Sequence, residues 1–539
     1  MSNRFKNHIK NLLLPCLAFS IATGFISAIF ITAFKLAVEH VISTSTGIYD
    51  TVRQNPIWIP LLILGAAALG FAASLILSAC RSCRGGGIPT AVAAIRGLVG
   101  FKWIVGVVVL PFSALLSYLC GVPLGTEGPC VQMGTAIGEG VIRCFGKRKH
   151  KSWRRYAMTG GAAAGFSIAT ASPISAVIFS MEELHKKFSP MLLTAASISV
   201  MTAQITMQLL AYFGIGSYKL FHIAEIPALS PRLLFAPILV GILCGGFSIL
   251  FTHCYYFIDK IVRRILSKLS IKIVFPLLFA AVSVAGLGLA DGLGSGHALI
   301  DSLLEWKNVW YMLLLIFAVR MIFMMFANTS GVTGGVFLPT LAFGAIFGSL
   351  GFRVMEAFGW IGEEHYVLMV VLGITAFLSA TSRIPITACV FAIEALGGIH
   401  NVLPLIIATT AAILVVEASG VEDFTDTVIE SKIHQITKGK KPHTLTIRLV
   451  VQPDSFIIGK EMHDILWPNA CTIVAFKHAR QNMGKVGIHA GDMIIVRYDT
   501  YEPATTAEEI VDLVGTQAEE TWQHMVTCEA HMEFNEQME

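Results

Sequence analysis

The chain has 539 residues, of which 55% are hydrophobic and 14% are charged, and its formal net charge is +4. Because soluble domains average about 25% charged residues, this composition excludes a wholly soluble protein and indicates a chain that lies largely in lipid. The net charge is unremarkable, and we expect no nucleic-acid partner.

Hydrophobic segments follow one another from Leu12 to Val416, and many of them carry no charge, among them Pro56–Cys80, Phe188–Tyr218 and Met321–Phe352. A transmembrane helix needs about 20 apolar residues, so we expect roughly a dozen helices or more in this region. Several segments are too short, or too rich in glycine and proline, to cross a membrane alone. The run that begins at Leu12 is too long for a signal peptide.

Lysine and arginine gather in short segments between the apolar runs. Because short basic loops remain on the cytoplasmic side, we expect all of these segments there. They are Arg81–Arg84, Arg143–Arg155, Lys186–Lys187, Lys260–Lys272 and Lys438–Lys441.

Three Gly-x-x-x-Pro motifs lie within the apolar region: Gly85–Pro89, Gly125–Pro129 and Gly335–Pro339. Proline fits the first turn of a helix and glycine lets the preceding backbone bend, so each motif predicts a helix that begins inside the bilayer. The unpaired N–H groups of such a helix start can bind an anion. Three starts aimed at one point predict an anion site without a full positive charge, since lysine or arginine would hold the ion too tightly for transport. A single motif would indicate only a kink or close packing.

Glu127 lies inside the second of these motifs. A carboxylate within a bilayer is costly and is functional by default. At a helix N-terminus it can mimic the anion and occupy the anion's position, and protonation would release it. We therefore expect Glu127 to act as both gate and proton carrier, with a simple helix cap as the alternative.

Glu182 and Glu183 end a helix that begins near Pro173, and a basic segment follows them. One of the two carboxylates could relay protons between the cytoplasm and Glu127. An ordinary helix-end carboxylate paired with the neighbouring lysines is the alternative, and the spacing alone favours it.

The apolar region contains an internal repeat with an offset of about 210 residues. The pattern G-x3-P-x4-G-x3-G begins at Gly125 and again at Gly335, and the sequence from Pro173 resembles the sequence from Pro385. We therefore expect two homologous halves, at about 12–215 and 230–420. Such repeats are typical of secondary transporters, whose substrate lies between the halves at the midplane. The spacing does not decide whether the repeats are inverted.

Beyond a polar hinge at 438–442 the sequence is typical of a small soluble domain, at about 443–515. Alternating or continuous apolar residues predict strands at 445–451, 471–476 and 493–498. Ser455 predicts the start of a short helix over 457–466. We expect residues 516–539 to form a mobile tail.

The three motifs, in this order, are highly specific and are similar to those of CLC anion transporters. Gly85–Pro89 resembles the GSGIP motif of that family, Gly125–Pro129 its G(K/R)EGP motif and Gly335–Pro339 its GxFxP motif. The resemblance covers nearly all of residues 12–435. It implies that residues 1–435 form an all-α polytopic membrane protein with the CLC fold of two inverted repeats and broken helices. It also implies a homodimer in which each subunit holds its own pore.

The resemblance also implies roles for single residues. Glu127 matches the external gating glutamate of the family, and Glu183 matches the internal proton glutamate found in the exchangers. The amides of Val336 and Phe337 are expected to contact the central anion. The residues expected around the anion are Gly86, Gly87, Ile88, Gly125, Glu127, Gly128, Gly335, Val336, Phe337 and Thr425.

Three positions depart from the family pattern. Gly86 replaces the serine of GSGIP, and Thr425 stands near the place of the family's central tyrosine. These two changes alter both side-chain ligands of the central site and leave anion choice and the inner gate open. Thr126 replaces the lysine or arginine before the gating glutamate, which removes a charge from the outer vestibule.

The C-terminal segment resembles the C-terminal subdomain of RCK (TrkA-C) regulators. The resemblance depends on Gly459-Lys460, Trp467-Pro468 and Ala490–Asp492 within a strand-rich pattern. It implies a small α/β cytosolic domain that binds an unknown small ligand or dimerises. With it we expect a prokaryotic inner membrane location and a cytoplasmic C-terminus.

A proton-coupled chloride antiporter best accounts for Glu127 and Glu183, and its partners would be chloride or a similar inorganic anion, protons and membrane lipid. A passive anion channel on the same fold is the alternative, which the altered central ligands favour. An intramembrane protease is a third possibility, but no histidine partner motif accompanies Glu182 and Glu183, so we expect no enzyme. The eleven cysteines lack framework spacing, and we expect no disulfide framework, metal or cofactor.

Overall fold

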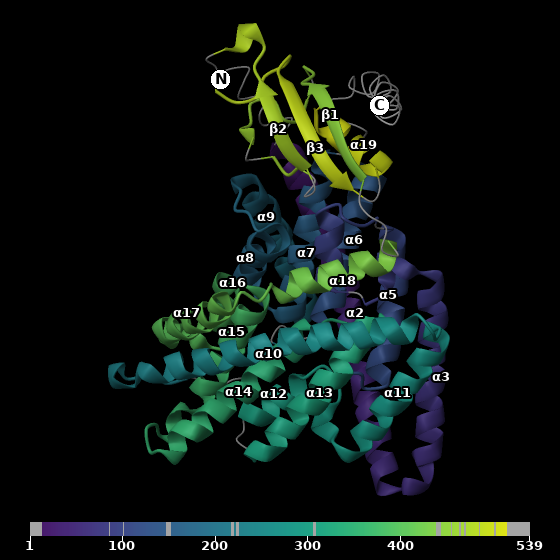
Figure 1. The fold of residues 1–539 in the computed structure, drawn as a ribbon, viewed down its shortest axis with the longest axis vertical. Coiled ribbons are helices and arrows are strands. Elements are labelled where there is room, and N and C mark those ends of the chain that lie inside the picture. Colours follow the sequence, from purple (N-terminus) through teal and green to yellow (C-terminus); the bar gives the residue numbers. More distant parts are fainter. Residues whose placement is uncertain are drawn as a thin grey trace, which may run out of the picture.

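The computed structural model describes residues 13–514, apart from positions 86, 101, 147–151, 217–219, 222–225, 305–308, 438–442, 454, 463–464, 468–470, 484–485 and 501–502. It shows a helical body that carries a small unit of strands at one end (Figure 1). Within the described ranges, nine helices are long and apolar enough to cross a membrane. The expected all-α polytopic architecture with a small α/β unit is confirmed. The expected hinge at 438–442 and tail at 516–539 lie outside the described residues.

The helices of the body form two series that correspond in order. The first series is α2 (Leu14–Gln54), α3 (Ile59–Ala79), α4 (Ile88–Ile95), α5 (Trp103–Leu119), α6 (Glu127–Phe145), α7 (Arg154–Thr170), α8 (Pro173–Phe179) and α9 (Pro190–Tyr212). The second is α10 (Phe235–Leu266), α11 (Ile271–Gly288), α12 (His297–Leu304), α13 (Trp310–Ser330), α14 (Phe337–Ala357), α15 (Tyr366–Ser382), α16 (Pro385–Ala395) and α17 (Val402–Ser419). A further helix, α18 (Phe424–Thr437), follows them. The helices α4, α8, α12 and α16 are far too short to cross a bilayer and are the broken elements of the fold.

Equivalent glycines bring equivalent helices into close contact in the two series. A β-carbon on Gly134 of α6 would lie 2.0 Å from the carbonyl oxygen of Gly161 on α7. A β-carbon on Gly344 of α14 would lie 2.6 Å from the carbonyl oxygen of Gly373 on α15. Since only glycine permits this approach, the recurring glycines of the repeat are explained by backbone contact between helices.

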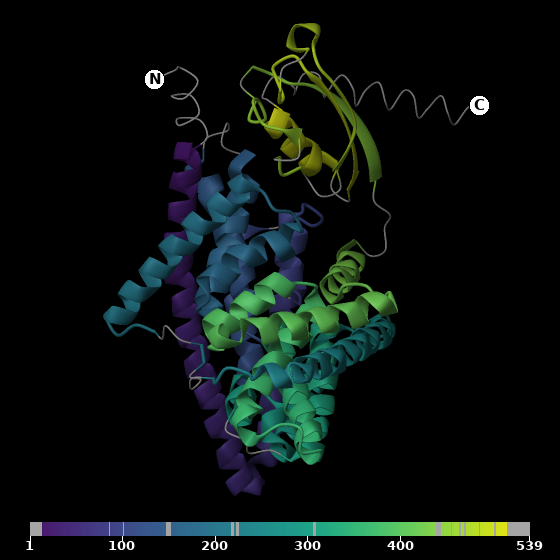
Figure 2. The same cartoon turned by 90° about the vertical axis from the view of Figure 1, so that its left-hand side faces the viewer.

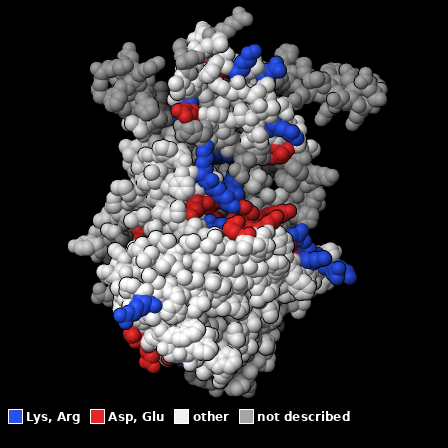
Figure 3. Space-filling model, turned by 60° about the vertical axis from the view of Figure 1, so that its left-hand side comes forward, with Lys and Arg blue, Asp and Glu red and all other residues white. Residues whose placement is uncertain are grey.

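The outer surface of the body is suited to lipid. Large apolar side chains are exposed on it, among them Leu64, Phe257 and Leu277, each more than half exposed. Few charged side chains interrupt the face shown in Figure 3, whereas basic and acidic residues gather where the body meets the C-terminal unit. An apolar surface of this extent indicates a membrane-embedded, multi-pass protein.

The C-terminal unit is an antiparallel sheet in the order β1-β3-β2, formed by β1 (His443–Val450), β3 (Met493–Thr500) and β2 (Cys471–Lys477). The helix α19 (Pro503–Val514) packs with the sheet, and Ile447, Leu449 and Ile510 lie in their shared core. The three expected strands are present, but α19 was not foreseen.

The α-helix expected over 457–466 is wrong, because Ile457–Gly459 form turns and, of the residues described after them, only Met462 has a helical (3-10) conformation. Gly459 has a φ of 78°, which ends any helix there. Its N–H donates to the carbonyl oxygen of Ile488, and the N–H of Ile488 donates to that of Lys460. The segment therefore pairs with the loop before β3.

The C-terminal unit stands over the end of the body at which α2 begins (Figure 2). The Glu509 carboxylate of α19 forms ion pairs with Arg154 and Arg155 at the start of α7, the second at 2.7 Å. Beside them, the Trp153 ring meets the Phe456 ring edge-on at 5.3 Å. The junction therefore combines an apolar contact with a nearly buried ion pair.

Glu509→Gln is expected to loosen this junction. Burial alone would raise the pKa of Glu509, but the guanidinium groups of Arg155 and Arg154 outweigh it and lower that pKa. A lowered pKa contributes stability above the ordinary value of about 4.3, and this contribution is lost as the pH falls through the lowered value. At neutral pH the variant should lose about 2 kcal/mol of docking free energy. Hydrogen exchange of the β3 and α19 amides checks this.

The control for this variant is Asp499→Asn, which changes an exposed carboxylate of the same sheet. It should leave hydrogen exchange unchanged. Equal rates of amide hydrogen exchange in Glu509→Gln and in the unaltered protein would show that the ion pair does not hold the C-terminal unit in place.

Candidate functional site

The helices α4, α6 and α14 begin at one place. The loops before α6 and α14 pair antiparallel, because the N–H of Gly125 donates to the Gly335 carbonyl oxygen at 2.6 Å and the N–H of Gly335 donates back at 2.7 Å. The third loop, which precedes α4, joins them through Gly87. A β-carbon placed on Gly128 would lie 2.6 Å from the α-carbon of Gly335 and 2.9 Å from that of Gly87. The expectation that the three motifs aim at one point thus agrees with the geometry.

Gly128→Ala is expected to disturb this meeting of three backbones. The added methyl group would collide with main-chain atoms on two sides, which cannot move away as a flexible side chain can. We expect a loss of about 1–3 kcal/mol of stability and most of the transport activity. The matched control is Gly246→Ala in α10, where an added β-carbon has no atom within 4 Å. Equal unfolding temperatures for Gly128→Ala and Gly246→Ala would contradict the close approach of the backbones at Gly128.

The backbone amides at this place differ in what they bind. The N–H of Gly87, which caps α4 with a φ of 138°, donates to Oε1 of Gln132 at 2.7 Å. The N–H groups of Val336 and Phe337, at the start of α14, have no acceptor in the described part of the chain. Unpaired amides at a helix start can hold a small anion. Ile88 is buried as the first residue of α4, and Gly86 lies outside the described residues.

Glu127 is the first residue of α6 and is only 1% exposed. The carboxylate lies back over the helix start, since its Oε2 would be 2.6 Å from a β-carbon on Gly125. One oxygen accepts a hydrogen bond from the Thr126 hydroxyl at 3.3 Å, and Oε2 finds no hydrogen-bond partner among the residues that the structure describes. A carboxylate held here covers a place where an anion could bind. When protonated it can swing away and carry its proton with it.

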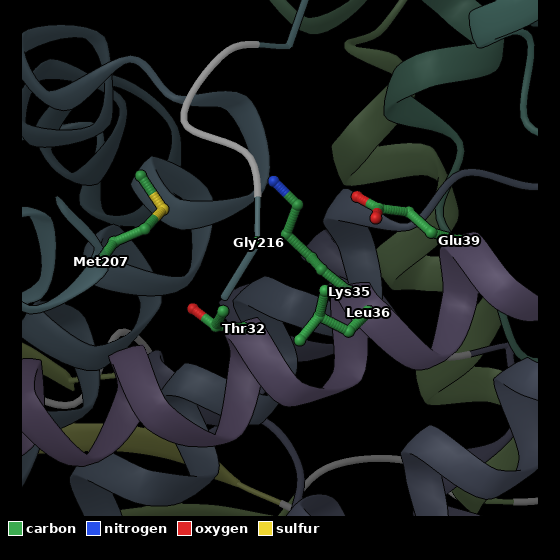
Figure 4. A pocket seen from close by; sticks show the side chains of 6 residues that line it. All are labelled: Thr32, Lys35, Leu36, Glu39, Met207 and Gly216. Atoms are coloured by element: carbon green, nitrogen blue, oxygen red, sulfur yellow. The ribbon is translucent and has the colours of Figure 1, made fainter. Parts of the chain in front are cut away.

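A lysine from a distant helix lies near this carboxylate. Lys35 of α2 is within electrostatic range of Glu127, and its ammonium donates to the Ile168 carbonyl oxygen at 3.0 Å. Figure 4 shows Lys35 in a pocket that it shares with Thr32, Leu36, Glu39, Met207 and Gly216. Lys35 therefore places a positive charge within electrostatic range of Glu127, although the residue before Glu127 is the uncharged Thr126.

The adjacent residues Glu182 and Glu183 have different surroundings. Glu182 accepts hydrogen bonds from the N–H groups of Ile386 and Thr387, at 3.1 and 2.8 Å, and so caps α16. Its repeat mate Glu394 caps α8 in the same way, through the N–H groups of Ile174 and Ser175. Glu182 is therefore a structural residue that joins the two halves.

Glu183 lies in a buried polar cluster and is 2% exposed, and within the described ranges its Oε2 has no hydrogen-bond partner. The Thr425 side chain and Asp423 interact with its carboxylate. Asp423 accepts a hydrogen bond from Lys186 at 2.8 Å, and Lys186 is 41% exposed in its side chain. The cluster thus leads from a buried carboxylate to solvent, as proton transfer requires. Thr425 lies beside Glu183, and its expected role as an anion ligand stays a prediction.

One group of potential metal ligands was not foreseen from the sequence. It consists of His478, His489 and Asp492 in the C-terminal unit, whose ligand atoms lie within 4.8 Å of one another. The Asp492 carboxylate accepts hydrogen bonds from the N–H groups of Ala479 and His489, at 2.9 and 2.8 Å. These hydrogen bonds let Asp492 fix the conformation of the segment between β2 and β3.

Comparison with known proteins gives one family and several relatives. The sequence profile described as "Voltage gated chloride channel" matches residues 68–417. The "H(+)/Cl(-) exchange transporter ClcA" of Vibrio cholerae serotype O1 is 27% identical over 445 residues, which is 78% of this chain and 90% of that protein. The protein of the same name from Yersinia pseudotuberculosis is 28% identical over 370 residues, covering 68% of this chain and 76% of that protein.

Solved structures share the fold of the helical body. A slow cyanobacterial Cl−/H+ antiporter superimposes with a TM-score of 0.70 at 22% identity, covering 78% of this chain and 98% of the other. A eukaryotic CLC transporter gives a TM-score of 0.64 at 21% identity, covering 78% of this chain and 74% of the other. A CLC-type fluoride/proton antiporter gives 0.60 at 20% identity, covering 75% of this chain and 95% of the other.

Proposed function

This chain belongs to the voltage-gated chloride channel family, or CLC family, and from that premise we propose that it exchanges chloride for protons across a membrane. The relatives named as H(+)/Cl(-) exchange transporters support this function, as do the solved structures of antiporters with the same fold. The chain covers 90% of the length of the Vibrio cholerae relative.

One observation carries the proposal: a buried glutamate lies over the point at which three helix starts meet. The free amides of Val336 and Phe337 would bind the anion, together with the backbone around Gly87, Gly125 and Gly335. Glu127 would occupy this path when charged and leave it when protonated. Each exchange of a carboxylate for an anion would then move a proton in the opposite direction.

Glu183 supplies the second half of the proposal. It is as buried as Glu127 but is connected through Asp423 to Lys186, which reaches solvent. Protons would pass between this end of the body and Glu127 through Glu183. Two buried carboxylates with separate surroundings favour coupled exchange over simple anion flow.

A passive channel is the second candidate, and the departures at Gly86 and Thr425 favour it. A central site with fewer side-chain ligands would hold its anion less firmly, so that anions could cross without waiting for a proton. A passive channel would have the same fold and would bind the anion at the same helix N-termini.

We also propose an oligomeric state, a role for the C-terminal unit and a membrane location. Two copies would form a homodimer with one pathway each, and residues 443–515 would form an RCK-like domain in the cytoplasm, next to the basic residues at its junction with the body. A small ligand of unknown identity would bind this domain. The membrane would be a prokaryotic inner membrane.

Purified protein in liposomes tests the exchange. A chloride gradient is imposed from inside to outside, valinomycin with potassium fixes the voltage, and the external pH is recorded. Proton uptake against its own gradient would establish exchange. Chloride flux without proton uptake would exclude exchange and favour the channel.

A further inference from the structure

The cluster of His478, His489 and Asp492 in the C-terminal unit has no part in the proposed transport. His478 directly follows β2, and Asp492 directly precedes β3. Because Lys477 and Met493 are opposite each other in the antiparallel sheet, the residue after the one and the residue before the other leave the sheet side by side. The Nδ1 atom of His478 lies 3.0 Å from Oδ2 of Asp492. One ligand atom from each residue of the cluster lies within 4.8 Å of the other two.

The carboxylate of Asp492 is held in one orientation by hydrogen bonds from several sides. Its Oδ1 accepts from the N–H of Ala479 at 2.9 Å and from the side-chain amide of Asn482 at 3.0 Å. Its Oδ2 accepts from the N–H of His489 at 2.8 Å and also contacts the His478 ring. The residue is fully buried. A ligand that is oriented by neighbouring hydrogen bonds binds its metal ion more tightly, so this carboxylate is suited to hold one.

The ring of His489 is fixed in the form that a metal ion requires. Its Nδ1 lies 2.9 Å from the carbonyl oxygen of Gly487, which can only accept a hydrogen bond. Nδ1 therefore carries the proton of the neutral ring, and Nε2 keeps the lone pair with which imidazole binds a metal. Metal-binding histidines commonly donate their other ring N–H to a backbone carbonyl in this way. His478 and His489 are both partly exposed, so an ion can reach them from solvent.

The distances within the cluster suit a tetrahedral ion. Two ligand atoms that each lie about 2.0–2.2 Å from zinc are about 3.4 Å apart when their bonds make a tetrahedral angle. The 3.0 Å between His478 and Asp492 is close to this, and a small rotation of the His489 side chain would bring its nitrogen to the same spacing. As the ion binds, the neutral His478 ring would move its proton from Nδ1 to Nε2, so that Nδ1 can bind the ion and no proton leaves the ring.

We propose that His478, His489 and Asp492 bind a divalent transition-metal ion, with zinc as the best fit and a water molecule as the fourth ligand. Imidazole and carboxylate groups together are ligands that zinc prefers, whereas magnesium and calcium prefer oxygen ligands alone. This gives a chemical identity to the small ligand proposed for the C-terminal unit. It also departs from the expectation that the chain binds no metal.

The metal site is connected to the contact between the C-terminal unit and the helical body. Ile488, which precedes the second histidine of the site, exchanges backbone hydrogen bonds with Gly459 and Lys460. Phe456, in the same segment, packs against Trp153 at the start of α7. A bound ion would therefore restrict the motion of the segment through which the C-terminal unit contacts the body.

Calorimetric titration of the full-length, metal-stripped protein with zinc sulfate tests the site in His478→Gln, His489→Gln and the control His443→Gln. His443 begins β1 of the same sheet and is exposed. Each site variant should weaken zinc binding by at least about tenfold, since the loss of a hydrogen bond to a metal ligand already costs about 10–100-fold in affinity. The control should bind zinc as the unaltered protein does.

Anomalous scattering at the zinc absorption edge locates the ion in the unaltered protein, so the test does not depend on whether a variant folds. Zinc-soaked crystals should show a peak within bonding distance of the three ligand residues. Zinc density only at other places would overturn the proposal, as would unchanged zinc affinity in both site variants. Because neither measurement needs transport, a failure of the proposed exchange would leave the metal site standing, and a failure of the metal site would leave the exchange standing.

Discussion

Glu127→Gln is expected to stop proton movement while chloride continues to cross. The amide has nearly the shape of the carboxylic acid, so it can remain in the pocket beside Thr126 and Gly125. It carries no negative charge to compete with the anion and no proton to exchange. In the liposome assay, proton uptake should fall to that of empty vesicles, and chloride flux should lose its dependence on pH.

The control for Glu127→Gln is Glu356→Gln, which changes a carboxylate near the end of α14 that pairs with Arg353. It should exchange chloride and protons as the unaltered protein does. Proton uptake by Glu127→Gln at the normal rate would show that the proton passes elsewhere, and the proposed gate would then be wrong.

Glu183→Gln should also abolish proton uptake, but chloride flux should keep its dependence on external pH. Glu183 is separate from the helix starts and belongs to the cluster with Asp423 and Thr425. Replacing its carboxylate removes a proton acceptor without altering the proposed gate at Glu127. Measuring proton uptake and chloride efflux in the same vesicles separates the two effects.

The adjacent glutamate provides a matched control for this variant. Glu182→Gln weakens the cap on α16 and should lower the unfolding temperature by a few degrees, as the loss of a cap does. It should leave the number of protons moved per chloride unchanged. If Glu182→Gln loses protons and Glu183→Gln does not, the assignment of the two residues is reversed.

The helix starts could be predicted from the sequence because their chemistry is local. Glycine before proline fixes where α6 and α14 begin, and the repeat relates Glu127 to Phe337. The close contact of Gly128 with Gly335 agrees with the same pattern. The unpaired N–H groups at a helix start cannot face lipid, so helix starts inside a bilayer must turn toward the interior of the protein.

Other features depend on residues that are far apart in the chain. The pairing of Glu182 with the start of α16 spans 204 residues, and without it the two glutamates could not be told apart. Lys432 meets Gly85 across 347 residues, and no local sequence pattern indicates that contact. The helix expected after Ser455 failed because a backbone pairing with Ile488 outweighs its local preference.

The most direct test of the account is the location of a heavy halide in the structure. Crystals grown in bromide should show anomalous density at the amides of Val336 and Phe337. In Glu127→Gln a second bromide should take the place of the carboxylate over the start of α6. Density at neither place, under conditions in which the protein transports bromide, would contradict an anion path through the meeting point of the three helices.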